Sequence, residues 1–98
     1  MKIGQAIKDL RKQKGLSQKD LAAKIDISQA SLSQIESGMN RPNPTTMQKL
    51  CEELQIPESL IYIMATDVND IPKDKQLVFE ALFPTVKNWI LQIAELKK

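Results

Sequence analysis

The pattern Ser-Gln-x-x-Leu occurs twice in this chain, at Ser17–Leu21 and eleven residues later at Ser28–Leu32. A serine ahead of a helix-forming run is typical of a helix start, because its hydroxyl accepts a backbone N–H that has no partner in the first turn. Two short helices are therefore predicted, over about residues 18–24 and 29–37. Only Ile25–Ile27 is left to connect them.

Two short helices joined by a turn of this length form a helix-turn-helix, whose second helix can lie in the DNA major groove. The outward face of that second helix has no charged residue and carries Gln29, Ala30, Ser33 and Gln34. Glutamine suits base edges, because its amide offers a donor and an acceptor that match N6 and N7 of adenine. The alternative is an ordinary solvated helix face, which usually carries Lys and Glu.

From Ile3 to about Met64 the chain resembles the Cro/phage-repressor (XRE-type) helix-turn-helix domains, which are five-helix, all-α folds. The resemblance rests on Leu10-Arg11, Gly15-Leu16-Ser17-Gln18, Leu21-Ala22, Ile27-Ser28, Leu32, Ile35-Glu36-Ser37-Gly38, Arg41-Pro42 and Pro44. Asp26 departs from the family, which usually has glycine at this turn. Aspartate enters the left-handed region more readily than most residues, so we expect the turn to form at a small cost.

The resemblance also implies roles for individual residues. Base contacts are expected from Gln29, Ala30, Ser33 and Gln34. Phosphate contacts are expected at helix N-termini and the loop after the second helix, from Gln18, Ser28, Ser37, Asn40 and Arg41. A partly buried salt bridge between Arg11 and Glu36 is expected to hold the recognition helix to the rest of the domain.

The charge distribution favours duplex DNA as the partner. Residues 1–50 hold nine Lys or Arg against four Asp or Glu, whereas residues 51–98 hold five against eight. The half with the helix-turn-helix is therefore the basic one, as attraction to phosphates requires. All four aromatic residues follow residue 60, at Tyr62, Phe79, Phe83 and Trp89. A single-strand binder would instead interleave aromatic residues with its basic surface.

Composition argues against an enzyme. The chain has no histidine and one cysteine, so His-based acid–base chemistry and a Cys/His metal cluster are excluded. No cofactor is expected. Cys51 belongs to an apolar helical stripe, so core packing is favoured over redox sensing. A single cysteine suits a reducing cytoplasm, the expected location. The longest apolar run, Leu60–Ala65, is too short to cross a bilayer, and no signal-peptide core is expected at the N-terminus.

The predicted organisation is a helix-turn-helix domain over residues 1–66, a short linker over 67–72 and a C-terminal extension over 73–98. Domain helices are expected at about 2–14, 18–24, 29–37, 44–55 and 57–64. Gly15 and Gly38 end the first and third, and Asn43 caps the fourth. The extension is predicted as two helices, Lys73–Leu82 and Pro84–Lys98, because proline disfavours helix at the residue before it.

The extension carries more apolar surface than 26 residues can hide by themselves. One stripe on its last predicted helix comprises Val86, Trp89, Ile90, Ile93 and Leu96, and Leu91 is placed on the far side. Two alternatives remain open: the extension folds back on the helices at 2–14 and 57–64, or it forms a subunit interface. The interface predicted in the second case comprises Leu82, Phe83, Val86, Trp89, Ile90 and Ile93.

The sequence thus predicts a sequence-specific duplex-DNA-binding transcriptional regulator. It is expected to be a repressor or autoregulator that works as a homodimer. The alternative is an antitoxin-like protein, whose C-terminal helices bind a partner protein while the N-terminal domain regulates its own promoter. The acidic extension with its aromatic residues keeps that alternative open.

Overall fold

The structure, a computed structural model, describes residues 1–95. Its helices are α1 (Ile3–Gln13), α2 (Gln18–Lys24), α3 (Gln29–Glu36), α4 (Pro44–Leu54), α5 (Glu58–Ala65) and α6 (Gln76–Glu95), with 3-10 turns η1 (Val68–Asp70) and η2 (Lys73–Lys75) before α6. These residues contain no strand, so the predicted all-α class is confirmed. None of their helices is long and apolar enough to cross a membrane.

The predicted caps define the starts of three helices. Ser17 Oγ accepts the N–H of Asp20 at 3.0 Å, and Ser28 Oγ accepts that of Ser31 at the same distance. Asn43 caps α4 in the same way. Each cap satisfies an N–H that the helix itself leaves without a partner, so the short helices begin where the sequence predicts.

The turn between α2 and α3 forms without glycine. Asp26 takes a φ of 60° there, in the left-handed region. Gly15 and Gly38, which follow α1 and α3, have φ values of 71° and 85°. Such values strain residues with a Cβ, so Asp26 is tolerated at a cost that the two glycines avoid.

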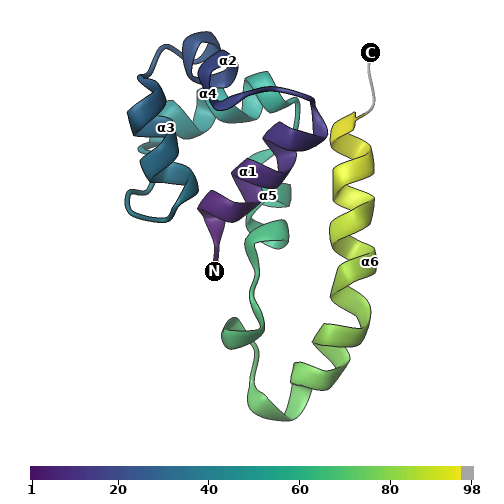
Figure 1. The fold of residues 1–98 in the computed structure, drawn as a ribbon. Helices are drawn as coiled ribbons and strands as arrows, with labels where there is room; N and C mark the ends of the chain where they lie inside the picture. Colours follow the sequence, from purple (N-terminus) through teal and green to yellow (C-terminus); the bar gives the residue numbers. More distant parts are fainter. Residues whose placement is uncertain (96–98) are drawn as a thin grey trace.

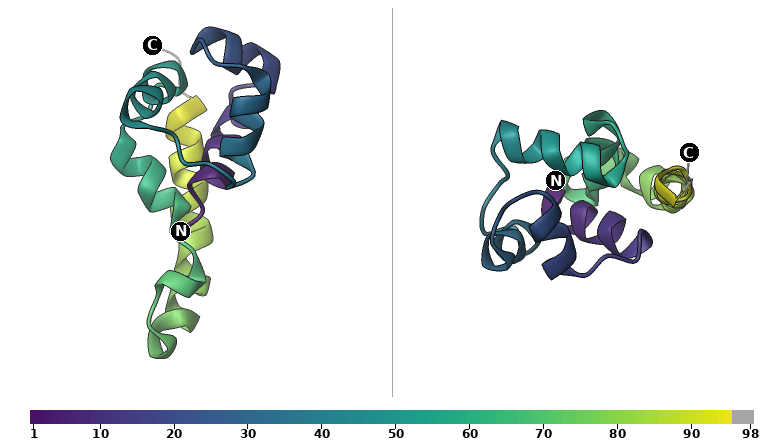
Figure 2. Two further views of the ribbon diagram at one scale, coloured as in Figure 1. Left: turned by 90° about the vertical axis from the view of Figure 1, so that its left-hand side faces the viewer. Right: turned by 90° about the horizontal axis from the view of Figure 1, so that it is seen from above.

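The core lies around α1, which packs against α3, α5 and α6. In Figure 1 α1 and α5 occupy the middle of the molecule, with α2 and α3 to one side and α6 to the other. The view from above in Figure 2 agrees, so α3 and α6 lie on opposite sides of the central helices. Figure 2 also shows that the linker and the first turns of α6 project beyond the five-helix body.

The extension is one helix, and the predicted break at Phe83 and Pro84 is wrong. Helix α6 runs through Pro84, while Lys73–Lys75 forms the 3-10 turn η2. An internal proline removes one helical hydrogen bond and costs about 3 kcal/mol. Packing on both sides of Pro84 offsets this cost: the Phe79 and Phe83 rings stack with centroids 4.5 Å apart before it, and Ile90 and Ala94 are buried after it.

One face of α6 belongs to the protein core, as the fold-back alternative predicted. Ile90 is 1 % exposed and Ala94 is fully buried, and both join the core cluster. Lys87 Nζ lies 3.0 Å from Asp9 Oδ2 on α1. Two sequence assignments are therefore wrong: Ile90 is not available to a partner, and Leu91 packs against the core.

Both assignments are wrong because the periodicity of apolar residues does not give the side of α6 that docks on the domain. The docked side is centred on Ile90 and Ala94, so Val86 and Trp89 of the predicted stripe are turned outward and Ile93 is half-buried. Leu96 and the predicted helix end at Lys98 lie outside the described residues.

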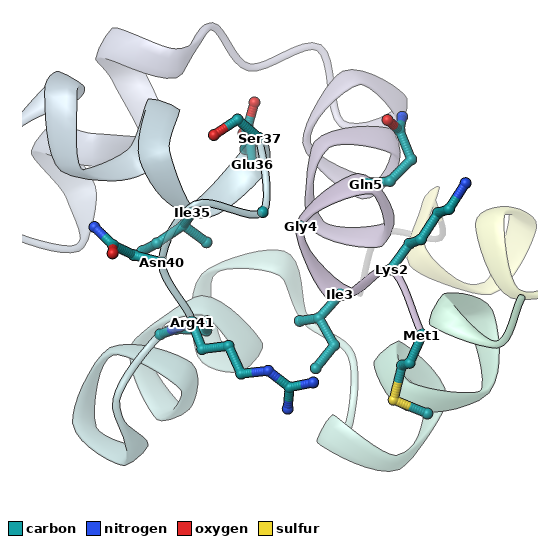
Figure 3. A pocket seen from close by; sticks show the side chains of 12 residues that line it. Met1, Lys2, Ile3, Gly4, Gln5, Ile35, Glu36, Ser37, Asn40 and Arg41 are labelled. Carbon is teal, nitrogen blue, oxygen red and sulfur yellow. The ribbon is translucent and has the colours of Figure 1, made fainter. Parts of the chain in front are cut away.

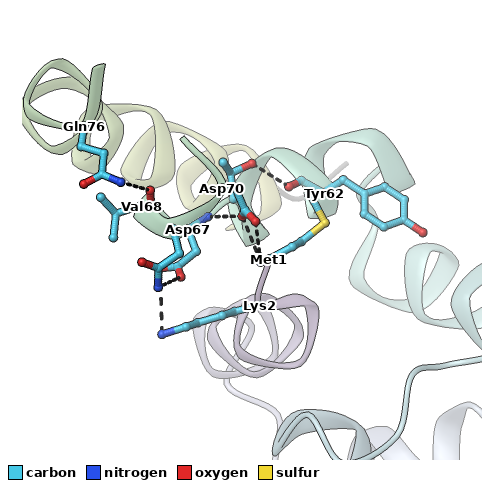
Figure 4. A network of polar contacts seen from close by, with 9 residues as sticks. Met1, Lys2, Tyr62, Asp67, Val68, Asp70 and Gln76 are labelled. Carbon is cyan, nitrogen blue, oxygen red and sulfur yellow. Dashed lines mark hydrogen bonds and ion pairs between the residues drawn. The ribbon is translucent and has the colours of Figure 1, made fainter. Parts of the chain in front are cut away.

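Polar contacts tie the linker to the start of the chain (Figure 4). The Met1 ammonium lies 2.9 Å from Asp70 Oδ2, and the Lys2 N–H donates to the Ala65 carbonyl at 2.7 Å. Asp70 also accepts the N–H of Asp67 at 2.8 Å. The pKa of Asp70 is lowered, first by that backbone hydrogen bond and then by the ammonium. The linker is thus held by hydrogen bonds and ion pairs.

Candidate nucleic-acid interface

Helix α3 divides into a buried side and an exposed, uncharged side. Leu32, Ile35 and Glu36 are buried against the domain. The exposed side carries the four residues predicted to contact bases, Gln29, Ala30, Ser33 and Gln34. The fold therefore presents two amides and two small side chains together, as a surface that enters a groove and contacts base edges requires.

A buried ionic network holds α3 in place. Arg11 Nε lies 2.7 Å from Glu36 Oε2, and Arg11 Nη2 donates to Glu36 Oε1 at 3.0 Å. The two side chains are 8 % and 2 % exposed. Glu36 raises the pKa of Arg11 by accepting these hydrogen bonds. Because the contacts are bidentate, they fix orientation as well as distance.

The same network reaches α2. Gln18 Nε2 donates to Glu36 Oε1 at 3.0 Å, and Arg11 Nη1 donates to the Leu16 carbonyl at 2.7 Å. One carboxylate therefore links α1, α2 and α3. The amide of Gln18, predicted to contact phosphate, has an intramolecular partner in this structure.

The backbone of α1 approaches the end of α3 closely at Gly4. A Cβ at this position would overlap the Ile35 carbonyl oxygen and lie 2.8 Å from that of Glu36. Only glycine fits between these helices without a shift of backbone, which is costly in a packed core. This contact was not predicted from the sequence, although an isolated glycine inside a helical pattern is a signal for it.

The other uncharged side chains predicted to contact phosphate also form hydrogen bonds within the chain. Ser28 Oγ donates to Ser31 Oγ at 2.9 Å while it caps α3. Ser37 Oγ donates to the Gln34 carbonyl at 3.0 Å. Asn40 Nδ2 donates to Gln34 Oε1 at 2.7 Å. These residues therefore shape the edge of the α3 surface, and sequence reasoning did not anticipate their mutual bonds.

Arg41 differs from the other predicted phosphate contacts. It is exposed and forms no salt bridge with any carboxylate within residues 1–95. Its side chain points into a hollow of about 360 Å³ between the loop after α3 and the start of α1 (Figure 3). Lys2 and Gln5 line the same hollow, but the Lys2 side chain points away from Arg41 (Figure 3), and its ammonium lies 3.9 Å from Asp67 Oδ1.

The described residues offer no metal site built from His, Cys, Asp or Glu. Cys51 is half-buried, and desolvation raises the pKa of its thiol, with a smaller contribution from Glu58. A raised pKa disfavours the reactive thiolate. Cys51 packs against the core cluster.

Comparison with known proteins agrees with this geometry. The family model described as "Helix-turn-helix" matches residues 7–61. The chain is 32 % identical over 73 residues to the "Uncharacterized HTH-type transcriptional regulator RghRB" of Bacillus subtilis (strain 168), covering 74 % of this chain and 52 % of that protein. It is 39 % identical over 62 residues to the "HTH-type transcriptional repressor RghR" of the same organism, covering 61 % of this chain and 46 % of that protein.

The chain thus spans about half the length of these two relatives. No solved structure matches it significantly. The family model, however, covers more than half of the chain, including α2, α3 and the turn between them. The chain therefore belongs to the helix-turn-helix family of the Cro/phage-repressor type, a family of DNA-binding proteins and not of enzymes.

Proposed function

We propose that this chain is a sequence-specific, duplex-DNA-binding transcriptional regulator that acts as a repressor or autoregulator. The observation that carries the proposal is the exposed, uncharged face of α3, held on a buried Arg11–Glu36 pair. A fixed helix presents its side chains to base edges at constant positions, which is what discrimination between bases requires.

The contacts divide into two groups. Base edges are contacted by Gln29, Ala30, Ser33 and Gln34 on the exposed face of α3. Phosphates are contacted by Gln18, Ser28, Ser37, Asn40 and Arg41, which lie at helix N-termini and in the loop after α3. Phosphate contacts fix the position of the helix in the groove, and base contacts supply the sequence preference.

Two further observations support regulation of transcription. The basic excess lies in residues 1–50, which include α2 and α3. One relative carries the name of a transcriptional repressor, and this chain is similar to it over 62 residues. Repression needs only occupancy of a site, which a DNA-binding domain of this size can supply.

Selection of bound duplexes from random DNA tests the proposal. The full chain is expected to enrich a defined site whose two halves are related by two-fold symmetry. Footprinting of that site by the pure protein, at more than one salt concentration, then separates specific from non-specific binding. Enrichment of no sequence would rule out sequence-specific binding.

We also propose that the regulator is a homodimer joined through the outer face of α6. Leu82 and Trp89 are 62 % and 61 % exposed, Val86 is 37 % exposed and Ile93 is half-buried. Their spacing of four, three and four residues is that of a coiled-coil seam. A two-fold interface must be self-complementary, and a continuous apolar stripe meets that need.

Ile90 is no longer part of the proposed interface, because its side chain is in the core. Phe83 also leaves the proposed interface, because it stacks on Phe79 and lines a hollow between α6 and the helices α1 and α5. The proposed contact set is therefore Leu82, Val86, Trp89 and Ile93.

Two leucines of α6 provide a matched test of the dimer. Leu82→Glu places a charge in the proposed seam, whereas Leu77→Glu places it at an exposed position on another side of the helix. Sedimentation is expected to show a dimer for the wild type and Leu77→Glu, and a monomer for Leu82→Glu. Operator binding should weaken with Leu82→Glu alone.

The antitoxin-like alternative predicts a different result in the same experiment. The pure wild-type chain would sediment as a monomer at micromolar concentration. Purification from its own cells would recover the chain together with a second protein. Leu82→Glu would then abolish that association. A wild-type dimer that Leu82→Glu leaves intact would place the interface elsewhere in the chain.

A further inference from the structure

The loop after α3 turns back and bonds to the last of the predicted base-contacting residues. Gly38 takes a φ of 85°, which reverses the chain. The Asn40 N–H then donates to the Gln34 carbonyl at 3.2 Å, and Asn40 Nδ2 donates to Gln34 Oε1 at 2.7 Å. Asn40 is therefore bonded to both the backbone and the side chain of the same residue.

The side chains of Asn40 and Arg41 point in opposite directions from this loop (Figure 3). Arg41 points into the hollow beside α1, whereas Asn40 forms a hydrogen bond with a residue of α3. Ser37 strengthens the arrangement, because its hydroxyl donates to the Gln34 carbonyl and accepts the Met39 N–H. Loop residues on both sides of Gly38 thus converge on Gln34.

A glutamine amide can present either its oxygen or its nitrogen, because the two ends have nearly the same shape. In this structure the Asn40 amide donates Nδ2 to Gln34 Oε1, which turns that oxygen toward the loop. The Nε2 group is the end left to donate outward. Donors match acceptors in the major groove, which are N7 and O6 of guanine, N7 of adenine and O4 of thymine.

We propose that Asn40 is a positioning residue that fixes the orientation of the Gln34 amide and thereby sets the base preferred at one position of the operator. This inference rests on the proposed function and adds to it a determinant of specificity. With Nε2 outward and directed at the exocyclic group of the base, O6 of guanine or O4 of thymine can accept its hydrogen bond, whereas the amino groups of adenine and cytosine cannot. The contacted strand then favours a keto base at the position facing Gln34. With Oε1 outward, it would favour an amino base, adenine or cytosine.

Two substitutions of Asn40 impose opposite orientations. In Asn40→Asp the carboxylate only accepts hydrogen bonds, so Gln34 must donate Nε2 to it and turn Oε1 outward. In Asn40→Lys the ammonium only donates, so Gln34 keeps the wild-type orientation. The added charges alter affinity for all duplexes, but they do not favour one base over another.

The test is duplex selection with the wild type, Gln34→Ala, Asn40→Asp and Asn40→Lys, each shown to be folded by circular dichroism. Gln34→Ala identifies the base pair, because preference there should flatten. At that base pair Asn40→Asp should reverse the keto-over-amino preference by about tenfold, whereas Asn40→Lys should preserve it.

The outcomes separate this inference from the proposed function. If the wild type selects no sequence, the proposed function fails and the inference fails with it. If the wild type selects a site but Asn40→Asp keeps the same base at that position, only the role of Asn40 is refuted. Equal weakening on all sequences by both Asn40 variants would likewise refute it and make Asn40 a phosphate contact alone.

Discussion

The recognition side of the molecule and its α6 side are built in opposite ways. Beneath α3 lies a buried ion pair, and its exposed face is polar and uncharged. Beneath α6 lie mainly aliphatic side chains, and its exposed surface carries an apolar stripe in which Leu82 and Trp89 are more than half exposed. The two surfaces lie on opposite sides of α1 and α5 (Figures 1 and 2).

This difference matches what each surface would bind. Hydrogen bonds to base edges depend on angle, so α3 is held by a bidentate pair that fixes its orientation. Apolar contacts depend mainly on area and tolerate some rotation, so aliphatic packing is a sufficient support for α6. The exposed face of α3 differs from an ordinary solvated surface by its lack of charge, and the stripe on α6 differs from it by its exposed apolar side chains.

The largest expected effect concerns the ion pair beneath α3. Glu36→Gln keeps the shape of the side chain but leaves the buried Arg11 guanidinium without its counter-ion. Breaking one partner of a buried pair costs about 3–5 kcal/mol. We therefore expect the free energy of unfolding, measured by denaturant titration, to fall by about that amount.

Glu80→Gln is the matched control, because Glu80 is an exposed carboxylate on α6. Exposed carboxylates contribute about 0–1 kcal/mol at most. If both variants unfold at the wild-type denaturant concentration, the pair beneath α3 does not support the domain. The contrast between the two sides would then disappear.

A second prediction tests whether α6 belongs to the core. Ile90→Ala should lower the free energy of unfolding by about 2–5 kcal/mol, because Ile90 is 1 % exposed against α1 and α5. Leu77→Ala, at a position 83 % exposed, should change it by less than about 0.5 kcal/mol. Thermal or denaturant unfolding of the two variants measures the difference. Equally small changes would mean that α6 does not dock on the domain.

Much of the recognition side could be predicted from the sequence, because its signals are local. The caps at Ser17 and Ser28 follow from residue type and position, and Gly15 and Gly38 end helices through their positive φ. The resemblance to a known family supplied Arg11 and Glu36 as a pair. The structure places these two side chains in bidentate contact.

The α6 side was predicted less well, because its structure depends on tertiary packing. The rule that places a helix break before Pro84 is local, and burial of Ile90 and Ala94 outweighs it. Periodicity identified the apolar residues of α6 but not the angle at which it docks. The bond between Asn40 and Gln34 was missed for a similar reason, since it depends on the path of a loop.

A third prediction concerns base contacts on the exposed face of α3. Gln29→Ala should reduce affinity for the selected site by about 1–3 kcal/mol relative to random duplex, with unfolding unchanged. Gln92→Ala removes an exposed glutamine from α6 and should leave both affinities unaltered. Titrations of labelled duplexes provide the measurement. Equal losses on both DNAs with Gln29→Ala would show that Gln29 does not discriminate between bases.

The smallest expected effect separates residues that contact phosphates from residues that discriminate between bases. Arg41 carries a full charge at the loop after α3 and forms no salt bridge within residues 1–95. If each subunit of a dimer neutralises one phosphate through it, Arg41→Ala should reduce the slope of log affinity against log salt by about two, at roughly 0.9 per phosphate. Preference for the selected site over its variants should persist.

Lys75→Ala, which removes an exposed charge before α6, should leave the slope as it is. An unaltered slope with Arg41→Ala would remove Arg41 from the phosphate contacts, and a reduced slope with Lys75→Ala would extend the DNA-binding surface to the α6 side.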